Sequence, residues 1–90
     1  MKKEFIGHFA CSCSGHDAGT WYVVIAEEDG RLIVADGRLR TVERPKKKNP
    51  LHLQVAGAAV SQETMDLLAG KKGGADEAIR HEIGQYRPLL

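Results

Sequence analysis

The sequence predicts a mainly β protein, a small five-stranded barrel followed by a helical C-terminal appendage. Residues 1–56 hold five short apolar segments with turn residues between them, and residues 57–90 change to the apolar spacing of helices. Closure into a barrel is expected because it protects the edges that a flat sheet of this size would expose. We do not expect the helical extension to be an independent domain.

Five segments are expected to form the strands. Residues 21–26 are aromatic and β-branched, and the run is too short for a buried helix. Asp29-Gly30 predicts a hairpin turn, because this pair readily takes positive φ, and Asp36-Gly37 predicts a second tight turn. The predicted strands are residues 4–13, 21–26, 31–35, 38–42 and 51–55.

Two aromatic residues begin the second strand. We expect Trp21 to lie in the core and Tyr22 to be partly exposed. An aromatic ring on the surface beside the basic strand could stack on a nucleic-acid base.

Two helices are predicted after residue 56. Ser61 is a suitable cap for a helix over residues 62–69, which Gly70 would stop. Lys71-Lys72-Gly73-Gly74 is expected to be a flexible joint. A second helix over residues 76–86 is predicted from apolar residues at helical spacing, namely Ile79, Ile83 and Tyr86. This helix would pack on the barrel or on a partner.

Composition is typical of one globular domain in the cytoplasm. The chain has 90 residues, of which 42% are hydrophobic and 28% charged. No apolar run approaches the ~20 residues needed to span a bilayer, and no apolar stretch after the basic start resembles a secretory signal. Cys11 and Cys13 are too close together for a disulfide framework, so we expect free thiols in a reducing compartment.

Positive charge is concentrated in one segment. The whole chain has a net charge of +1, whereas residues 38–48 carry six cations and one acid. Such a local patch on a near-neutral scaffold predicts binding to a polyanion such as RNA or DNA. The cations are Arg38, Arg40, Arg44, Lys46, Lys47 and Lys48.

The geometry of this segment favours contact with phosphates. Pro45 and Pro50 exclude a long helix around the three lysines, which should run extended with their side chains free. In a strand, Arg38 and Arg40 would point to one face. We therefore expect replacement of the lysines by Ala to weaken RNA binding while leaving the melting temperature nearly unchanged.

A glycine loop joins the first two predicted strands. It reads Ser14-Gly15-His16-Asp17-Ala18-Gly19-Thr20, and its two glycines predict positive φ and a close backbone approach. Alone, a loop of this kind is more often a structural turn than a binding site.

The order of several motifs resembles one family of proteins. Gly7, the Gly-His-Asp-Ala-Gly loop, an apolar strand, Ala-Asp-Gly-Arg-Leu-Arg, Glu-Arg-Pro-Lys-Lys-Lys-Asn-Pro and Leu-His-Leu-Gln follow one another. This arrangement resembles the bacterial KOW-domain RNA-binding proteins, which are similar to certain KOW-type large-subunit ribosomal proteins of archaea and eukaryotes. The resemblance covers residues 5–55, and the closing helix also fits the family's tail.

The resemblance implies an SH3-like barrel that binds RNA, in particular ribosomal RNA, with ribosomal proteins as possible further partners. By position, Gly19 would be the KOW glycine, and Gly15 and Asp17 would shape its loop. The RNA-binding residues would be Arg38, Arg40, Arg44, Lys46, Lys47, Lys48 and His16. His16 and Ala18 stand where such loops usually carry cations, so His16 would bind better at mildly acidic pH.

A possible metal set overlaps the glycine loop. His8, Cys11, Cys13 and His16 carry metal-capable side chains, but Cys-x-Cys is closer than usual zinc spacings. On a regular strand the histidines would also face away from the cysteines. We therefore predict no metal and no cofactor, with Cys11 as a small buried hydrophobic residue.

No motif in the sequence indicates catalysis, a small-molecule substrate or a membrane. The alternative to RNA binding is a protein–protein interaction adaptor, in which an SH3-like barrel binds a peptide and the helix with Ile79 and Ile83 docks on a partner. Duplex DNA is a further alternative ligand, which differs from RNA in shape and in lacking the 2′-hydroxyl.

Overall fold

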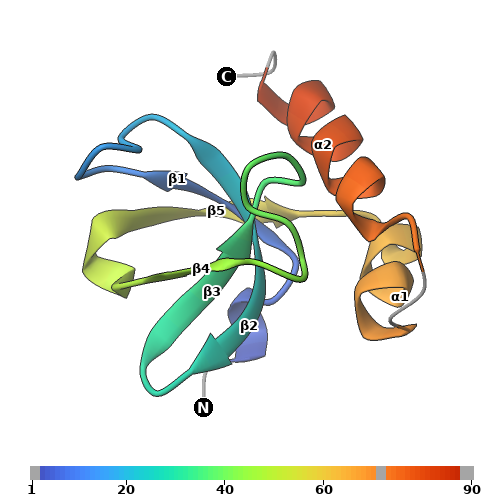
Figure 1. The fold of residues 1–90 in the computed structure, drawn as a ribbon, viewed down its shortest axis with the longest axis horizontal. Helices are drawn as coiled ribbons and strands as arrows, with labels where there is room; N and C mark the ends of the chain where they lie inside the picture. Colours follow the sequence, from blue (N-terminus) through green and yellow to red (C-terminus); the bar gives the residue numbers. More distant parts are fainter. Residues whose placement is uncertain (1–2, 71–72, 88–90) are drawn as a thin grey trace.

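The computed structural model describes residues 3–70 and 73–87, which form a five-stranded antiparallel sheet and two C-terminal helices (Figure 1). The expected joint residues Lys71 and Lys72 lie outside the described part of the chain. The strands are β1 (His8–Ser12), β2 (Trp21–Glu28), β3 (Arg31–Ala35), β4 (Lys46–Lys48) and β5 (Leu53–Ala59). The helices are the short 3-10 turns η1 (Lys3–Phe5) and η2 (Pro50–His52), then α1 (Gln62–Gly70) and α2 (Ala75–Tyr86).

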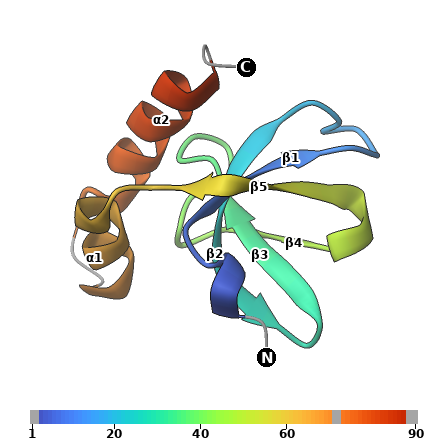
Figure 2. The same cartoon turned by 180° about the vertical axis from the view of Figure 1, so that it is seen from behind.

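Strand order in the sheet is β4-β3-β2-β1-β5. Asp29 and Gly30 both take positive φ, 52° and 76°, which confirms the predicted tight hairpin between β2 and β3. β5 returns to pair with β1, and Figure 2 shows it continuing toward α1. Among the described strands β4 and β5 are the two ends of an open sheet, so the predicted five-stranded β class is confirmed, whereas closure of the ladder is not seen.

The sheet is strongly curved, since Lys48 Nζ of β4 donates a hydrogen bond to Ser12 Oγ of β1 at 3.1 Å although two strands lie between them. Tyr22 and Val24 of β2, Leu32 and Val34 of β3, Ala10 of β1 and Leu53 of β5 form a single buried cluster. β3 and β5 are separated by two strands in the sheet order. Bulges in the β1–β5 and β2–β3 ladders accompany this curvature.

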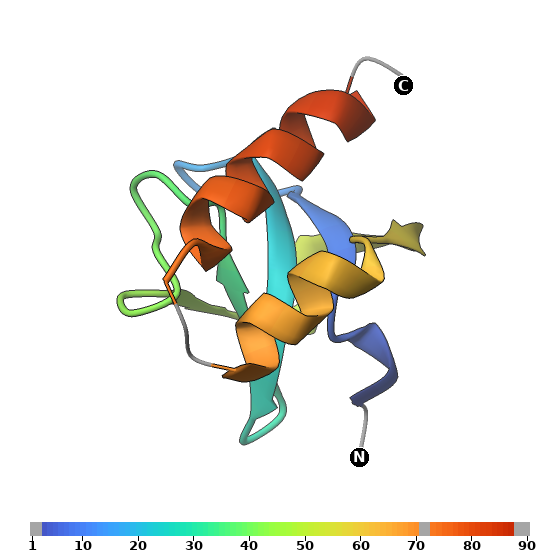
Figure 3. The same cartoon turned by 90° about the vertical axis from the view of Figure 1, so that its right-hand side faces the viewer.

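The other face of the sheet is covered by the helices (Figure 3). Ile79 and Ile83 of α2 pack against Phe9 of β1 and Val23 of β2, and the Tyr86 ring stacks on Phe9 at a centroid distance of 4.3 Å. The helical spacing predicted this apolar face, and the structure shows that the face packs on the protein's own sheet. The appendage therefore completes the core.

Ser61 caps α1 as predicted, since its Oγ accepts a hydrogen bond from the Thr64 backbone N–H at 3.3 Å. Glu82 of α2 reinforces this end. Its carboxylate accepts hydrogen bonds from Ser61 N–H at 3.0 Å, from Ser61 Oγ at 2.7 Å and from Thr64 Oγ1 at 2.6 Å. Burial raises the pKa of Glu82, but these hydrogen bonds outweigh burial and lower it. The two helices are thus locked together by a carboxylate that remains charged.

Four predicted strands have different bounds from those observed, although the second differs only in running on to Glu28. The predicted strand at residues 38–42 is wrong, since this segment forms a series of bends and the fourth strand is Lys46–Lys48. The first strand begins only at His8, after a turn in which Gly7 has a φ of 91°. The last strand runs to Ala59, so the expected boundary at residue 56 falls inside it.

Candidate nucleic-acid interface

The glycine loop between β1 and β2 has the backbone that its sequence predicts. Gly15 and Gly19 take φ values of 89° and 92°, a region that favours glycine. Backbone hydrogen bonds from Ala18 N–H to Gly15 O and from Thr20 N–H to Asp17 O close the loop. His16 is exposed on it.

Asp17 is the centre of a polar network that reaches across the sheet. Its Oδ1 accepts hydrogen bonds from Ser12 Oγ at 2.8 Å and from Lys48 Nζ at 3.1 Å. Its Oδ2 accepts hydrogen bonds from Tyr22 OH at 2.7 Å and from Lys46 Nζ at 3.2 Å. One carboxylate thereby connects the glycine loop to β1, β2 and β4.

The pKa values of the two titratable groups at the centre of this network, the Asp17 carboxyl and the Tyr22 phenol, are shifted in opposite directions. Burial raises the pKa of Asp17, but the hydrogen bonds from Tyr22, Ser12, Lys48 and Lys46 outweigh burial and hold it well below its usual range. Burial, together with the hydrogen bond to Asp17 and the charge of that residue, raises the pKa of Tyr22 above its usual range. The carboxylate therefore stays charged and the phenol stays neutral.

The three lysines lie on an extended strand, as predicted, but their side chains are not free. Lys48 is 7% exposed and belongs to the Asp17 network, as does Lys46. Lys47 faces the other way and pairs with Glu28 at 3.0 Å. The prediction that the lysine side chains are free is wrong, because carboxylates of the protein itself already neutralise these cations. Replacing the lysines by Ala would damage the fold as well as any binding surface.

The arginines before β4 lie on an exposed loop, which we call the arginine loop (residues 36–45). Asp36 begins it: its Oδ1 accepts hydrogen bonds from the backbone N–H groups of Arg38 at 2.9 Å and Arg40 at 3.0 Å. This local competition with the sheet ladder explains the missing strand. Arg38, Arg40 and Arg44 are all exposed, so the loop directs them to solvent.

α2 supports the arginine loop along its length. Gly37 packs on the first turns of α2, where a Cβ at this position would meet the Asp76 carbonyl oxygen. The Arg80 guanidinium donates a hydrogen bond to the Gly37 carbonyl, and the Asp76 carboxylate accepts one from Val42 N–H at 2.9 Å. The loop is thus held in a defined position beside the helix.

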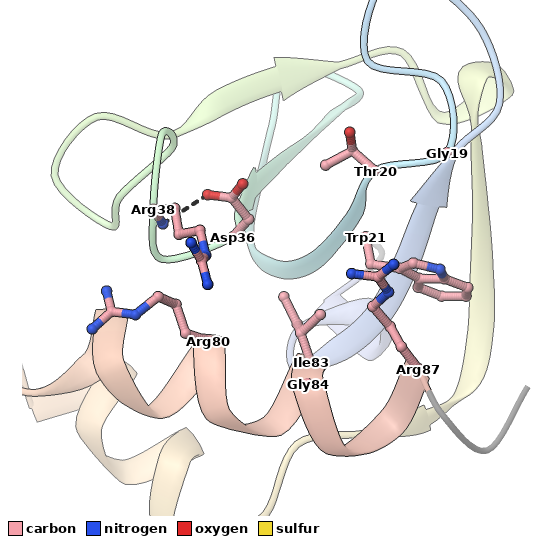
Figure 4. Close-up of a pocket in the computed structure, with 9 residues that line it drawn as sticks. All are labelled: Gly19, Thr20, Trp21, Asp36, Arg38, Arg80, Ile83, Gly84 and Arg87. Carbon is pink, nitrogen blue, oxygen red and sulfur yellow. Dashed lines mark hydrogen bonds between the residues drawn. The ribbon is translucent and has the colours of Figure 1, made fainter.

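A pocket of about 340 Å³ lies between the arginine loop, α2 and the start of β2 (Figure 4). Arg38 lines it from the loop, and Arg80 and Arg87 line it from α2 and its C-terminal end. Sequence reasoning missed Arg80 and Arg87. The available signal was their seven-residue separation, which puts both on one face of a helix.

The predicted burial of the two aromatic residues in β2 is reversed. Tyr22 is 3% exposed, whereas Trp21 is partly exposed and lines the pocket with the arginines. Both faces of β2 are covered, one by the curved sheet and one by the helices, so alternation alone could not decide the orientation. The partly exposed ring packs edge-on against Tyr86, with a centroid distance of 5.4 Å.

The four residues considered as metal ligands do not come together. Within residues 3–70 and 73–87, no group of three or more His, Cys, Asp or Glu side chains is placed to hold a metal ion. His8 Nδ1 lies 2.7 Å from the Ala56 carbonyl oxygen, and His16 is exposed on the glycine loop. Burial raises the pKa of the Cys11 thiol, and Cys13 raises it further, which disfavours the thiolate that metals bind.

Comparison with known proteins finds no match to this chain, either among protein-family models or among curated proteins. No helix in the described part of the chain is long and apolar enough to cross a membrane.

Proposed function

We propose that this protein is a non-enzymatic, cytoplasmic RNA-binding protein of the KOW type, which binds ribosomal RNA or ribosomal particles. The proposed binding surface consists of the arginine loop and the adjoining face of α2. Arginine suits this role, because its planar fork grips phosphate oxygens in pairs and keeps its charge at every physiological pH.

One observation carries the proposal: five arginines that take part in none of the ion pairs found among residues 3–70 and 73–87 lie on two elements tied to each other. On a chain with a net charge of +1, this makes the loop–helix face the main candidate for a cationic surface. The five residues are Arg38, Arg40, Arg44, Arg80 and Arg87.

An SH3-like barrel is the proposed fold type. In support of it, four strands follow one another in the sheet and the fifth returns to pair with the first. The hydrogen bond from Lys48 of β4 to Ser12 of β1, across two intervening strands, also requires the sheet to curl. The glycine loop, with Asp17 at its centre, would serve as a structural brace, which leaves phosphate contact mainly to the arginines.

The proposal is tested by replacing Arg38, Arg40 and Arg44 together with Gln. We expect affinity for a structured ribosomal RNA fragment to fall about tenfold or more, because three charge-assisted phosphate contacts are lost. Fluorescence anisotropy of labelled RNA measures the affinity, and the melting temperature checks the fold. The matched control is Arg31→Gln, an exposed arginine on the β2–β3 hairpin.

If the triple variant and Arg31→Gln both bind the RNA fragment with the affinity of the wild type, the proposed arginine surface is rejected. Competition with duplex DNA then separates the remaining nucleic-acid alternatives, because an RNA binder senses A-form shape and the 2′-hydroxyl. The adaptor alternative has less support. Ile79 and Ile83, its expected docking residues, are 0% and 8% exposed within the core.

A further inference from the structure

The pocket beside Trp21 has a composition that the RNA-binding surface as a whole does not explain. Three arginines line it, against a single acidic residue, Asp36. The Asp36 Oδ1 already accepts two backbone hydrogen bonds within the arginine loop. Positive charge therefore dominates the pocket, which suits a phosphate group.

The pocket also offers a flat apolar surface and a hydroxyl next to this charge. The partly exposed indole of Trp21 lines it, and Thr20 adds a neutral hydrogen-bonding group. Figure 4 shows Thr20 and Trp21 at the start of β2, with Trp21 next to Arg87 in this view and Arg38 and Arg80 on the other side of the pocket. Base–aromatic stacking contributes to binding of unpaired nucleotides irrespective of their sequence.

The size of the pocket narrows the choice of ligand. At about 340 Å³ it falls at the lower end of small-molecule sites, which suits one nucleotide, whereas an inorganic phosphate would leave most of it empty. A regular duplex keeps its bases stacked inside the helix, so it presents phosphates to the arginines but no base to Trp21.

We propose that this pocket binds one unpaired nucleotide of the RNA, with its phosphate on Arg38, Arg80 and Arg87 and its base against Trp21. This inference rests on the proposed RNA-binding function and specifies the feature recognised, a bulged or terminal nucleotide. The sequence of that nucleotide is read weakly, because stacking tolerates every base.

Trp21 is the only tryptophan in the chain, so intrinsic fluorescence reports on this pocket directly. Two RNA hairpins are compared, one fully paired and one with a single bulged nucleotide in the same stem. We expect the bulged hairpin to quench Trp21 emission and to bind about tenfold more tightly by anisotropy, while the paired hairpin leaves the emission nearly unchanged.

The matched variants separate this pocket from the general cationic surface. Arg87→Gln, at an exposed position at the end of α2, should reduce the preference for the bulged hairpin to about twofold or less. Replacing Arg40 and Arg44 by Gln should weaken both hairpins by the same factor. Trp21→Leu should abolish the preference, and Arg87→Gln keeps the test valid if the leucine variant unfolds.

Failure of this inference differs from failure of the proposed function. Equal affinity for the two hairpins with unchanged Trp21 emission would overturn the nucleotide pocket and leave RNA binding intact. Absence of RNA binding would reject the proposed function, and adenosine 5′-monophosphate then tests the pocket alone. The pocket is supported if adenosine 5′-monophosphate quenches Trp21 emission and neither adenosine nor inorganic phosphate does so. It is overturned if adenosine 5′-monophosphate causes no quenching.

Discussion

Asp17 shows how one side chain can organise a loop and a strand that are far apart in the sequence. Its carboxylate joins Ser12 and Tyr22, five residues away on either side, to Lys46 and Lys48, which are 29 and 31 residues away. The cost of burying charge is offset here because each carboxylate oxygen accepts two hydrogen bonds. The glycine loop is consequently anchored to the far edge of the sheet.

Replacing Asp17 by Asn should therefore destabilise the protein by about 2–4 kcal/mol, since the buried Lys48 and the partly buried Lys46 lose their counterion. For a domain of this size the melting temperature should fall by roughly 10–25 °C. Calorimetry or thermal circular dichroism measures the change. Asp29→Asn is the matched control, because Asp29 is exposed at the hairpin tip and Asn tolerates its positive φ; an equal effect of both substitutions would contradict this role.

The lowered pKa of Asp17 also predicts how stability depends on pH. The folded protein holds this carboxylate charged below its ordinary pKa of 3.8, so its contribution is complete above that value. As the pH falls from there toward the lower folded pKa, the unfolded chain takes up the proton first and the contribution is lost. Urea unfolding at pH 5 and at pH 3 should show a larger loss of stability in the wild type than in Asp17→Asn. Parallel losses in the two proteins would assign the acid sensitivity to other carboxylates.

At the scale of elements, Gly37 determines how the arginine loop rests on α2. It needs glycine for two separate reasons, a φ of 79° and the closeness of the Asp76 carbonyl oxygen to the position of a Cβ. Only the first reason is visible in the sequence, through the Asp-Gly turn. The second arises because Gly37 and Asp76, 39 residues apart in the sequence, approach each other in the fold.

Gly37→Ala should cost about 3 kcal/mol, combining backbone strain with displacement of the loop from α2. Gly30→Ala isolates the strain: its φ of 76° is similar, but nothing lies within 4 Å of an added Cβ, so about 1 kcal/mol is expected. Chemical denaturation of the two variants measures the difference. Equal destabilisation would mean that the approach of the loop to the helix contributes nothing.

At the scale of the whole molecule, the structure separates the cations by their roles. Lys46, Lys47 and Lys48 pair with carboxylates of the sheet and its loops, whereas the five arginines lie on the loop–helix face. Salt should therefore affect RNA binding through the arginines, because each neutralised phosphate releases a counterion.

If all five arginines contact phosphates, the log–log dependence of affinity on salt should have a slope of about −3.5 to −4.5. In the Arg38, Arg40 and Arg44 triple variant the slope should shrink to about −1.4 to −1.8, since two arginines remain. Anisotropy titrations over a series of potassium chloride concentrations provide both values. Equal slopes would show that these arginines make no phosphate contacts.

Local chemistry was largely predictable from the sequence. The Asp29-Gly30 hairpin, the positive φ at Gly15 and Gly19, the Ser61 cap and the apolar face of α2 all appear as expected. Each depends on a few neighbouring residues, through backbone sterics, a short-range hydrogen bond or helical periodicity. The prediction of a strand at residues 38–42 failed because the Asp36 side chain offers the backbone a competing set of hydrogen bonds.

The amino-acid sequence alone therefore determined a mainly β chain of five short strands and two helices, with one cationic segment. Only the tertiary structure decided which cations of that segment are available, and that Arg80 and Arg87 join Arg38 around Trp21. The physical reason is distance: turns and helices follow from near neighbours in the chain, whereas charge pairing requires groups some 30 residues apart to meet within about 3 Å.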